Sequence, residues 1–317
     1  MTTTKKQNTR PRVVAVVGPT AVGKTALAIE LARALDGEII SCDSMQVYRD
    51  MSIGTAKATV AERQGVPHHL IDILDAGEDF SCADYASLAR VAIDDILSRG
   101  KTPIFCGGTG LYLDSVLEIP SFTDTVRDDD YRAKMEKFAL ENGADALHAL
   151  LREVDSESAE AIHKNNIKRV IRALEIFHTT GKKKSELDAI SRTQESPYDA
   201  CVLFLITSER EVLYERIDKR VDMMISDGLL DECRALWERG LLTNGSCASE
   251  AIGYKELLPY FEGTMTLDEC VAILKLATRH YAKRQISYFK RMNIVKFINV
   301  EGKTTHQIAQ EIADSLS

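Results

Sequence analysis

The chain has no long apolar run. No apolar stretch approaches the roughly 20 residues that a membrane-spanning helix requires. The basic start of the chain is followed by only a short apolar run, residues 13–17, which leads directly into a glycine motif. We therefore expect a strand at this place, and neither a signal peptide nor a membrane segment.

Cysteine is sparse and never paired in the sequence. The seven cysteines are isolated, no C-x-x-C spacing occurs, and an odd number cannot all be bridged. Scattered cysteines are typical of a reducing compartment and argue against a disulfide framework or a zinc site. We therefore expect a cytoplasmic protein. His68 and His69 have no third ligand at a metal spacing, so we expect them to have a structural or capping role.

Positive charge is in the minority, which counts against a nucleic-acid partner for the chain as a whole. Lys and Arg total 40 against 48 Asp and Glu, for a net charge of −8. Basic residues nevertheless gather in residues 164–172, 182–184 and 279–291. These stretches either bind RNA phosphates or are solvated helix faces, and composition leaves both open. For residues 182–184 we expect a solvated helix start and no site.

Short β-branched runs alternate with helical patterns near both ends of the chain. The predicted strands cover residues 13–17, 38–42, 70–73, 103–106, 201–206 and 294–298. Several are apolar on both faces, as parallel strands covered by helices are. The alternation predicts an α/β fold with a doubly wound parallel sheet.

Residues 117–199 interrupt this alternation. They contain no convincing strand, and we expect short helices over residues 128–142, 144–152, 156–163, 167–179 and 183–190. The interruption predicts an all-helical domain inserted into a catalytic core of residues 12–116 and 200–317, after a disordered start at residues 1–11. Beyond the insertion, the capping-box pattern Thr266-x-x-Glu269 predicts a long helix over residues 267–291.

The strongest motif is a complete G-x-x-x-x-G-K-T. It reads Gly18, Pro19, Thr20, Ala21, Val22, Gly23, Lys24, Thr25, between a predicted strand and an amphipathic helix. In such a loop the backbone N–H groups, the helix N-terminus and Lys24 bind phosphate oxygens, and the Thr25 hydroxyl can ligate Mg²⁺. The motif predicts a P-loop NTPase-like sheet and a polyphosphate ligand. It does not distinguish ATP from a diphosphate leaving group.

Asp43 follows the second predicted strand, at the sheet edge where α/β proteins bind ligands. It can be a Mg²⁺ ligand, a general base or the cap of a turn. These motifs also fit two other functions. One is an ATP-dependent small-molecule kinase, although the insertion and the basic C-terminal helix exceed what such a kinase needs. The other is a regulatory RNA-binding NTPase with Asp43 or Asp72 in a Walker-B role.

Further motifs follow the phosphate loop in a fixed order. They are Asp43-Ser-Met-Gln-Val-Tyr48, Ile53-Gly-Thr-Ala-Lys57, Pro67-His-His-Leu70, Gly107-Gly-Thr-Gly-Leu-Tyr112 and residues 165–174, 251–255 and 278–286. This series resembles the tRNA dimethylallyltransferase (isopentenyltransferase) family over residues 12–298. The combination is far more specific than the phosphate loop alone.

The resemblance implies transfer of a dimethylallyl group from dimethylallyl diphosphate to N6 of adenosine 37, beside the anticodon of a tRNA, with Mg²⁺ as cofactor. The phosphate loop would hold the diphosphate, with Thr20 beside it and Arg220 supporting it. Asp43 would be the general base, and Thr109 would contact the tRNA at the reaction centre. We expect a monomer, because nothing in the sequence indicates an obligate interface.

The resemblance also implies a set of contacts with the anticodon stem-loop. The implied residues are Asp43, Ser44, Met45, Gln46, Thr109, Arg132, Lys168, Arg169, Val170, Ile171, Arg172, Glu250, Ala251, Ile252, Gly253, Tyr254 and Lys255. Glu250 departs from the family pattern, in which a neutral amide or a basic residue is expected. Tyr281, Tyr288 and Phe289 are interleaved with cations, a pattern that fits either RNA contact or the core of an amphipathic helix, and we favour the core.

Overall fold

A parallel sheet organises the larger part of the chain. The computed structural model describes residues 10–117, 127–193, 195–207, 209–243 and 245–316, and within them the sheet has six strands. These are β1 (Arg12–Val17), β2 (Gly37–Cys42), β3 (His68–His69), β4 (Thr102–Gly107), β5 (Asp199–Ile206) and β6 (Val295–Asn299). Their order is β3-β2-β4-β1-β5-β6, and every neighbouring pair is parallel.

The strand order creates a crevice at one edge of the sheet. β1 pairs with β4 on one side and with β5 on the other. The connection from β1 to β2 skips over β4, so the chain leaves β1 and β4 toward opposite faces of the sheet. In open α/β sheets, ligands bind outside the carboxyl ends of two such strands.

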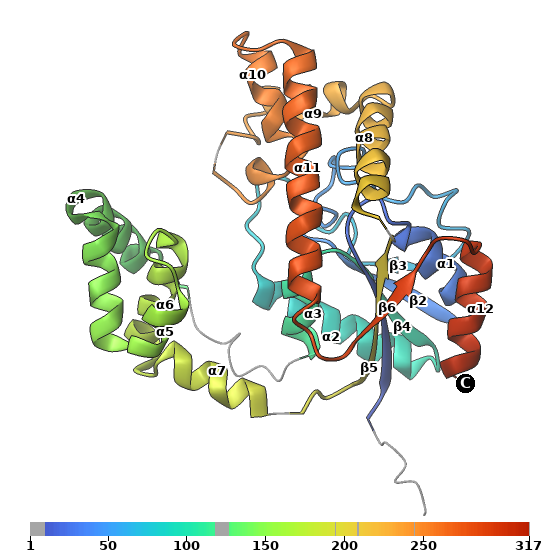
Figure 1. Ribbon diagram of the computed structural model, residues 1–317, viewed down its shortest axis with the longest axis horizontal. Helices are drawn as coiled ribbons and strands as arrows, with labels where there is room; N and C mark the ends of the chain where they lie inside the picture. Colours follow the sequence, from blue (N-terminus) through green and yellow to red (C-terminus); the bar gives the residue numbers. More distant parts are fainter. Residues whose placement is uncertain (1–9, 118–126, 194, 208, 244, 317) are drawn as a thin grey trace, which may run out of the picture. The chain divides into compact units, whose positions relative to one another are not determined.

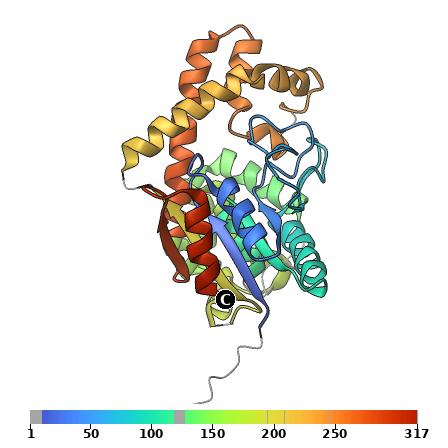
Figure 2. The ribbon, with the colours of Figure 1, turned by 90° about the vertical axis from the view of Figure 1, so that its right-hand side faces the viewer.

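Helices cover both faces of the sheet, as predicted. They are α1 (Lys24–Ala34) and α12 (Thr305–Leu316) on one face, and α2 (Cys82–Ser98) and α3 (Gly110–Leu117) on the other. The odd-numbered side chains of residues 13–17 pack against the second pair of helices and the even-numbered ones against the first, which explains why this strand is apolar throughout. Figures 1 and 2 show the two layers, with α1 and α12 side by side.

The third predicted strand, residues 70–73, is wrong in its position. The structure places β3 at His68–His69, and the chain turns immediately afterwards. Leu70 has a φ of +59° and Asp72 a φ of +56°, values that are incompatible with an extended strand. Residues 1–9 of the expected disordered start lie outside the part of the chain that the structure describes.

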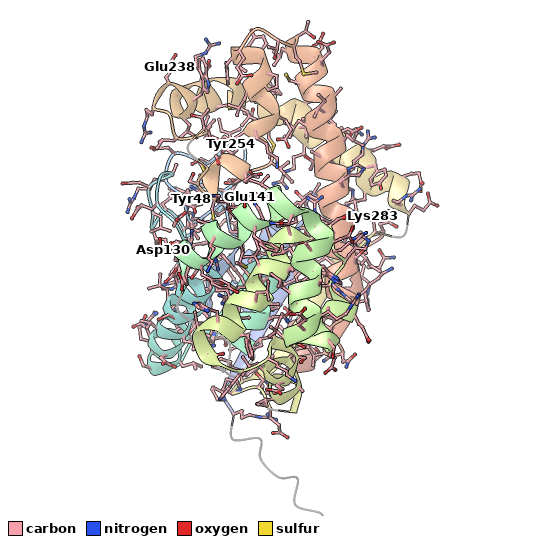
Figure 3. The ribbon with its side chains drawn as sticks, turned by 90° about the vertical axis from the view of Figure 1, so that its left-hand side faces the viewer. Tyr48, Asp130, Glu141, Glu238, Tyr254 and Lys283 are labelled. Atoms are coloured by element: carbon pink, nitrogen blue, oxygen red, sulfur yellow. The ribbon has the colours of Figure 1, made fainter. Side chains whose placement is uncertain are left out.

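A helical layer stands beyond the carboxyl ends of the strands (Figure 1). It comprises α8 (Arg210–Ser226), α9 (Leu229–Glu238), the 3-10 turns η1 (Ala248–Glu250) and η2 (Lys255–Leu257), α10 (Leu258–Phe261) and α11 (Leu267–Phe289). α11 begins with the predicted capping box, in which both reciprocal hydrogen bonds between Thr266 and Glu269 are present. Tyr48 and Tyr254, labelled in Figure 3, are fully buried in the core of this layer.

The stretch between β4 and β5 contains a separate helical unit. The chain divides into a unit of residues 1–117 with 197–317 and a second unit of residues 118–196. The second unit contains α4 (Asp129–Val154), α5 (Ser156–Ala161), α6 (Ile167–Thr180) and α7 (Lys184–Thr193). α4 unites two predicted helices across a kink at Gly143, where φ is +86°. In the ranges described, no helix has both the length and the apolar character needed to cross a membrane.

Gly107→Ala should destabilise the sheet. A Cβ at this position would meet the carbonyl oxygen of Cys42 at 2.0 Å, in the register pair that joins β2 to β4. We expect the free energy of unfolding, measured by urea denaturation, to fall by about 1–3 kcal/mol, the usual cost of overpacking. Gly77→Ala is the control, because its added Cβ would meet only the flexible end of Leu241 at 3.3 Å. Equal effects of the two substitutions would contradict the explanation.

Candidate active site

The phosphate loop, residues 18–25, joins β1 to α1. Gly18 has a φ of +152°, and a Cβ on it would meet the carbonyl oxygen of Leu205 at 2.8 Å. Gly23 is the N-cap of α1, with a φ of +95°, and has no side chain that could accept from the first helical N–H groups. Those groups and the positive end of the helix dipole are therefore available to an anion. Val22 anchors the loop, because its side chain is buried in the core between the sheet and the face covered by α1 and α12.

Lys24 adds a positive charge to this loop. Its Nζ donates a hydrogen bond to the carbonyl oxygen of Pro19 at 2.8 Å. Burial lowers the pKa of Lys24 to about 8; Cys106 and Asp43 oppose this shift, and Arg220 adds to it. An anion bound in the loop would stabilise the ammonium form. The electrostatics of the ligand-free site therefore favour a negatively charged occupant.

Arg220 approaches the same place from α8. Its side chain lines the cleft, where burial lowers its pKa and the nearby carboxylate of Asp43 raises it. Lys24 and Arg220 thus form a pair of cations close to one carboxylate. This confirms that residues far apart in the sequence meet beside the phosphate loop, although the roles assigned to them remain proposals.

Asp43 leaves β2 at the carboxyl edge of the sheet and lines the cleft. Its Oδ1 accepts a hydrogen bond from the backbone N–H of Met45 at 3.0 Å. Asp43 therefore caps a turn and also lines the cleft. The capping bond fixes the orientation of the carboxylate, which is what a positioned base or ligand requires.

Thr109 lies beside Asp43 because two backbone segments are tied together. The N–H of Thr109 donates to the carbonyl oxygen of Cys42 at 3.0 Å, and its Oγ1 accepts from the N–H of Ser44 at 3.1 Å. The glycine-rich turn permits this approach: a Cβ on Gly107 would meet the carbonyl oxygen of Cys42 at 2.0 Å. Thr109, which follows β4, is thus bonded to the residue before Asp43 and to the residue after it.

Tyr281 is a cleft residue that the sequence reasoning missed. We expected Tyr281, Tyr288 and Phe289 all to be core residues, and this is correct for Phe289, which is fully buried. Tyr281 instead lines the cleft, with its hydroxyl close to the side chain of Thr109. Burial, reinforced by the charge of Asp43, raises the pKa of Tyr281, so its hydroxyl stays protonated and can donate. Its position between two cations in the sequence carried no signal for this role.

Lys24, Asp43, Arg220 and Tyr281 share one large cleft of about 1300 Å³. Its walls come from the phosphate loop, residues 43–46, 52–59 and 250–253, α8 and α11. Ile217, Met224 and Leu274 add apolar surface beside the charged groups. Single small-molecule sites usually occupy about 300–1,000 Å³. The volume therefore leaves room for two ligands side by side.

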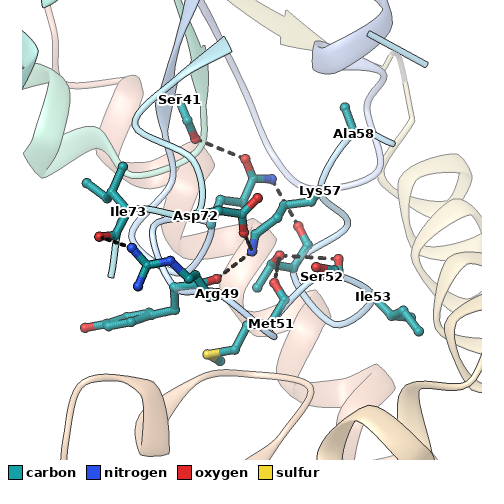
Figure 4. Close-up of polar contacts among 12 residues, drawn as sticks. Ser41, Arg49, Met51, Ser52, Ile53, Lys57, Ala58, Asp72 and Ile73 are labelled. Carbon is teal, nitrogen blue, oxygen red and sulfur yellow. Dashed lines mark hydrogen bonds and ion pairs between the residues drawn. The ribbon is translucent and has the colours of Figure 1, made fainter. Parts of the chain in front are cut away.

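Residues 43–46 were expected to contact tRNA. Ser44 and Met45 are half-buried and line the cleft, in agreement with a role there. The amide of Gln46 is engaged within the protein: its Oε1 accepts from the Ser41 hydroxyl at 3.0 Å, and its Nε2 donates to the carbonyl oxygen of Thr55 at 3.1 Å (Figure 4). Gln46 therefore holds the loop in shape.

Lys57 is a buried cation at the base of the same loop (Figure 4). Its Nζ donates to the carbonyl oxygen of Tyr48 and pairs with Asp72, both at 2.5 Å. Asp72 therefore neutralises a structural lysine. This pairing does not support the Walker-B role that the NTPase alternative gave to Asp72.

Glu232 of α9 fixes the start of this loop, and the sequence gave no signal for it. Its carboxylate accepts hydrogen bonds from the backbone N–H groups of Ser52, Ile53 and Gly54 at 2.9–3.1 Å. The hydroxyl of Tyr254 donates to the same carboxylate at 2.6 Å. The loop therefore keeps its conformation through one carboxylate that is distant in sequence.

Residues 250–255 form the facing wall of the cleft. The exposed side chains are Glu250 and Lys255, which pair at 3.3 Å. Ala251 and Tyr254 are buried, so their side chains cannot reach a bound RNA, contrary to the implied contacts. Any contact made by this stretch must come from its exposed ends, its backbone and its half-buried positions.

In the helical unit, two of the expected tRNA-binding arginines are occupied by a buried carboxylate. Arg132 donates two hydrogen bonds to Glu175, at 2.8 and 2.9 Å, and Arg172 donates one at 2.6 Å. Burial disfavours the charge on Glu175, but bonds from Arg132, the Asp128 N–H and Arg172 outweigh it and lower the pKa to about 2. The two arginines therefore hold this unit together, and their contact with tRNA remains a prediction.

The remaining expected contacts in α6 divide by burial. Val170 and Ile171 lie in the core of the unit, so their side chains are closed to a ligand, contrary to the implied contacts. Lys168 and Arg169 are exposed on the helix surface. These two are the fully exposed cations of this run, whereas Arg172 is paired with Glu175.

Thr25 is the residue expected to hold Mg²⁺. Within the described ranges, no group of three or more His, Cys, Asp or Glu side chains is placed to hold a metal ion. Thr25 and Asp43 nevertheless line one cleft and offer oxygen atoms, which Mg²⁺ prefers. This donor set fits a Mg²⁺ that is bound mainly by substrate phosphates and water.

His69, for which we expected a structural role, contacts a carboxylate of the protein. Its Nε2 lies 2.8 Å from the Oε2 of the buried Glu38.

The doubly wound parallel sheet, with its phosphate loop ahead of α1, defines a P-loop NTPase-like α/β protein. The sequence matches the IPP transferase family over residues 46–292 and the isopentenyl transferase family over residues 11–76. The chain belongs to the IPP transferase family, which confirms the resemblance inferred from its motifs.

Individual relatives agree with this assignment. The chain is 50% identical over 309 residues to a tRNA dimethylallyltransferase of Bacillus mycoides, covering 97% of this chain and 96% of the relative. A crystal structure of the tRNA isopentenylpyrophosphate transferase of Bacillus halodurans shares 44% identity with a TM-score of 0.73, over 97% of this chain and 96% of that one. A eukaryotic dimethylallyltransferase crystallised acting on tRNA shares 32% identity with a TM-score of 0.82, over 96% and 79%. These relatives support a prenyltransferase over the kinase alternative.

The lowered pKa of Lys24 predicts pH-dependent anion binding. As the pH rises through about 8, the ligand-free protein loses the Lys24 charge, so binding of inorganic diphosphate should weaken and should take up a proton. Titration calorimetry in buffers of different ionisation enthalpy measures both effects. Because diphosphate itself titrates, Lys24→Met is the control and should lose the part of the pH dependence that belongs to the lysine. Identical pH profiles of the two proteins would contradict this assignment.

Proposed function

We propose that the chain is a tRNA dimethylallyltransferase. It transfers a dimethylallyl group from dimethylallyl diphosphate to N6 of adenosine 37, beside the anticodon of a tRNA. The observation that carries this proposal is that one cleft places Lys24 and Arg220 at the phosphate loop and the carboxylate of Asp43 next to Thr109. The names of the relatives support the same reaction.

The chemistry accounts for this combination of groups. The amino group of adenine is a weak nucleophile, because its lone pair is delocalised into the ring. In the transfer, N6 attacks the allylic carbon, the bond from that carbon to oxygen breaks, and the diphosphate leaves with the electron pair. Lys24, Arg220 and N–H groups of the loop stabilise the charge that grows on the leaving group. Asp43 takes the amino proton, a contribution that is typically about 10²–10⁴-fold for a general base.

The proposal includes Mg²⁺ as the cofactor. Thr25 would hold it together with oxygens of the diphosphate, and when bound it would supply further neutralisation of the leaving group. We also retain the expected monomeric state and cytoplasmic location as parts of the proposal.

The acceptor requires a single-stranded nucleotide. Enzymes that modify a base take it out of its stack, and anticodon loops can present such a base. The C-terminal half of α11 and the two residues that follow it offer exposed cations for the phosphates of the loop. They are Lys283 (labelled in Figure 3), Arg284, Lys290 and Arg291. Tyr281, on the same helix, offers an aromatic ring in the cleft.

The transfer itself is tested with radiolabelled dimethylallyl diphosphate, Mg²⁺ and unmodified tRNA. Wild type should move label into tRNA, and Asp43→Asn should lower the rate by about 10²–10⁴-fold, because it keeps an acceptor for the Met45 N–H but removes the base. Asp314→Ala removes an exposed carboxylate on α12 and should leave the rate unchanged. If no label moves while ATP is hydrolysed or its γ-phosphate is transferred, the kinase alternative replaces this proposal.

The helical unit should contribute to tRNA affinity through Lys168 and Arg169. Replacing both with Ala should weaken tRNA binding and reduce the slope of log affinity against log salt by about 0.7 for each lost contact to a single strand. The matched control is the pair Lys182 and Lys183, which are exposed in the same unit and are assigned to no site. An equal loss of tRNA affinity in the two double variants would show that the net charge of the unit matters and not these two positions. An unchanged salt slope for Lys168 and Arg169 replaced by Ala would refute a phosphate contact.

A further inference from the structure

Gln285 bridges two loops of the cleft with a single amide. It lies near the end of α11 and is 4% exposed. Its Oε1 accepts a hydrogen bond from the backbone N–H of Thr20 at 2.9 Å. Its Nε2 donates to the carbonyl oxygen of Gly108 at 3.0 Å. One side chain therefore satisfies a donor from the phosphate loop and an acceptor from the glycine-rich turn after β4.

The turn is built to admit this side chain. A Cβ on Gly108 would lie 1.8 Å from the Nε2 of Gln285, so only glycine permits the contact. A buried amide is costly unless its polar atoms are paired, and both ends of this one are. An amide is also the side-chain group that can donate at one end and accept at the other in this geometry.

The two loops carry the opposite halves of the proposed reaction. Thr20 belongs to the loop that would hold the diphosphate. Gly108 immediately precedes Thr109, which is bonded to the backbone on either side of Asp43. The distance between the leaving group and the base therefore depends on the bridge through Gln285. Because Gln285 occupies the Thr20 N–H, the diphosphate must be bound by the other N–H groups of the loop.

We propose that Gln285 is a positioning residue for prenyl transfer, which sets the phosphate loop at the correct separation from Asp43 and Thr109. This inference rests on the proposed function. It assigns to Gln285 no contact with either substrate. The helix that carries it packs into the core of the helical layer, where Leu274 is buried, so the bridge is attached to a packed element.

The first test is Gln285→Met, which keeps a similar volume but can neither donate nor accept as the amide does. We expect kcat to fall by about 10²-fold, the typical cost of misplacing reacting groups by roughly 1 Å, with little change in KM for either substrate. Cys270→Ser is the matched control: it alters a fully buried side chain of the same helix away from the cleft and should leave kcat unchanged. Urea denaturation of both variants shows whether their stabilities are comparable.

The second test is Gln285→Glu, which has a pH signature that a purely structural defect lacks. The ionised carboxylate can accept from Thr20 but repels the carbonyl oxygen of Gly108, whereas the protonated form can donate to it. Burial raises the pKa of such a carboxyl group. The ratio of kcat between this variant and wild type should therefore rise as the pH falls. A constant ratio would argue against the bridge.

Hydrogen exchange tests the bridge without relying on the reaction. Gln285→Met should speed exchange in peptides that cover residues 18–25 and 107–111, and Cys270→Ser should not. Faster exchange with an unchanged kcat would overturn the positioning role. Unchanged exchange in both segments would overturn the bridge itself. If wild type transfers no prenyl group, the proposed function fails, whereas the exchange result still decides whether Gln285 couples the two loops.

Discussion

Every part of the site depends on concentrating groups that bind negative charge at one edge of a parallel sheet. Parallel strands deliver all their carboxyl ends to the same edge, so the loops after β1, β2 and β4 meet there. The N-terminus of α1 and Lys24 supply positive charge at that edge, and Asp43 supplies the carboxylate beside it. Burial at that edge lowers the pKa of Lys24, the charge of Arg220 lowers it further, and a bound anion would offset both effects.

The helical layer completes what the sheet edge begins. α8 brings Arg220 to the cleft, and α11 brings Tyr281 and Gln285. Side chains on helices that are packed into a common core are held more firmly than side chains on loops, which suits groups that must meet reacting atoms at fixed distances. The cleft is thus shared between the loops at the sheet edge and the helices of this layer.

Backbone polar groups in this region are paired by side chains from distant elements. Glu232 accepts from the N–H groups of residues 52–54, and Gln285 bridges the loops after β1 and β4. In the helical unit, Glu175 likewise gathers Arg132 and Arg172. Each arrangement satisfies groups that would be costly to bury alone. These bonds tie segments that are far apart in the sequence to one another.

The sequence by itself determined the local features: the phosphate loop, the capping box of α11, the alternation that makes the sheet, and the helical insertion. Each is written within a few neighbouring residues, because backbone conformation and periodicity are short-range properties. Only the tertiary structure decided that Gln285 meets Thr20, that Tyr281 faces the cleft, and that Val170 is buried instead of facing RNA. The physical reason is that burial and pairing depend on which distant segments pack together, and no local pattern records that choice.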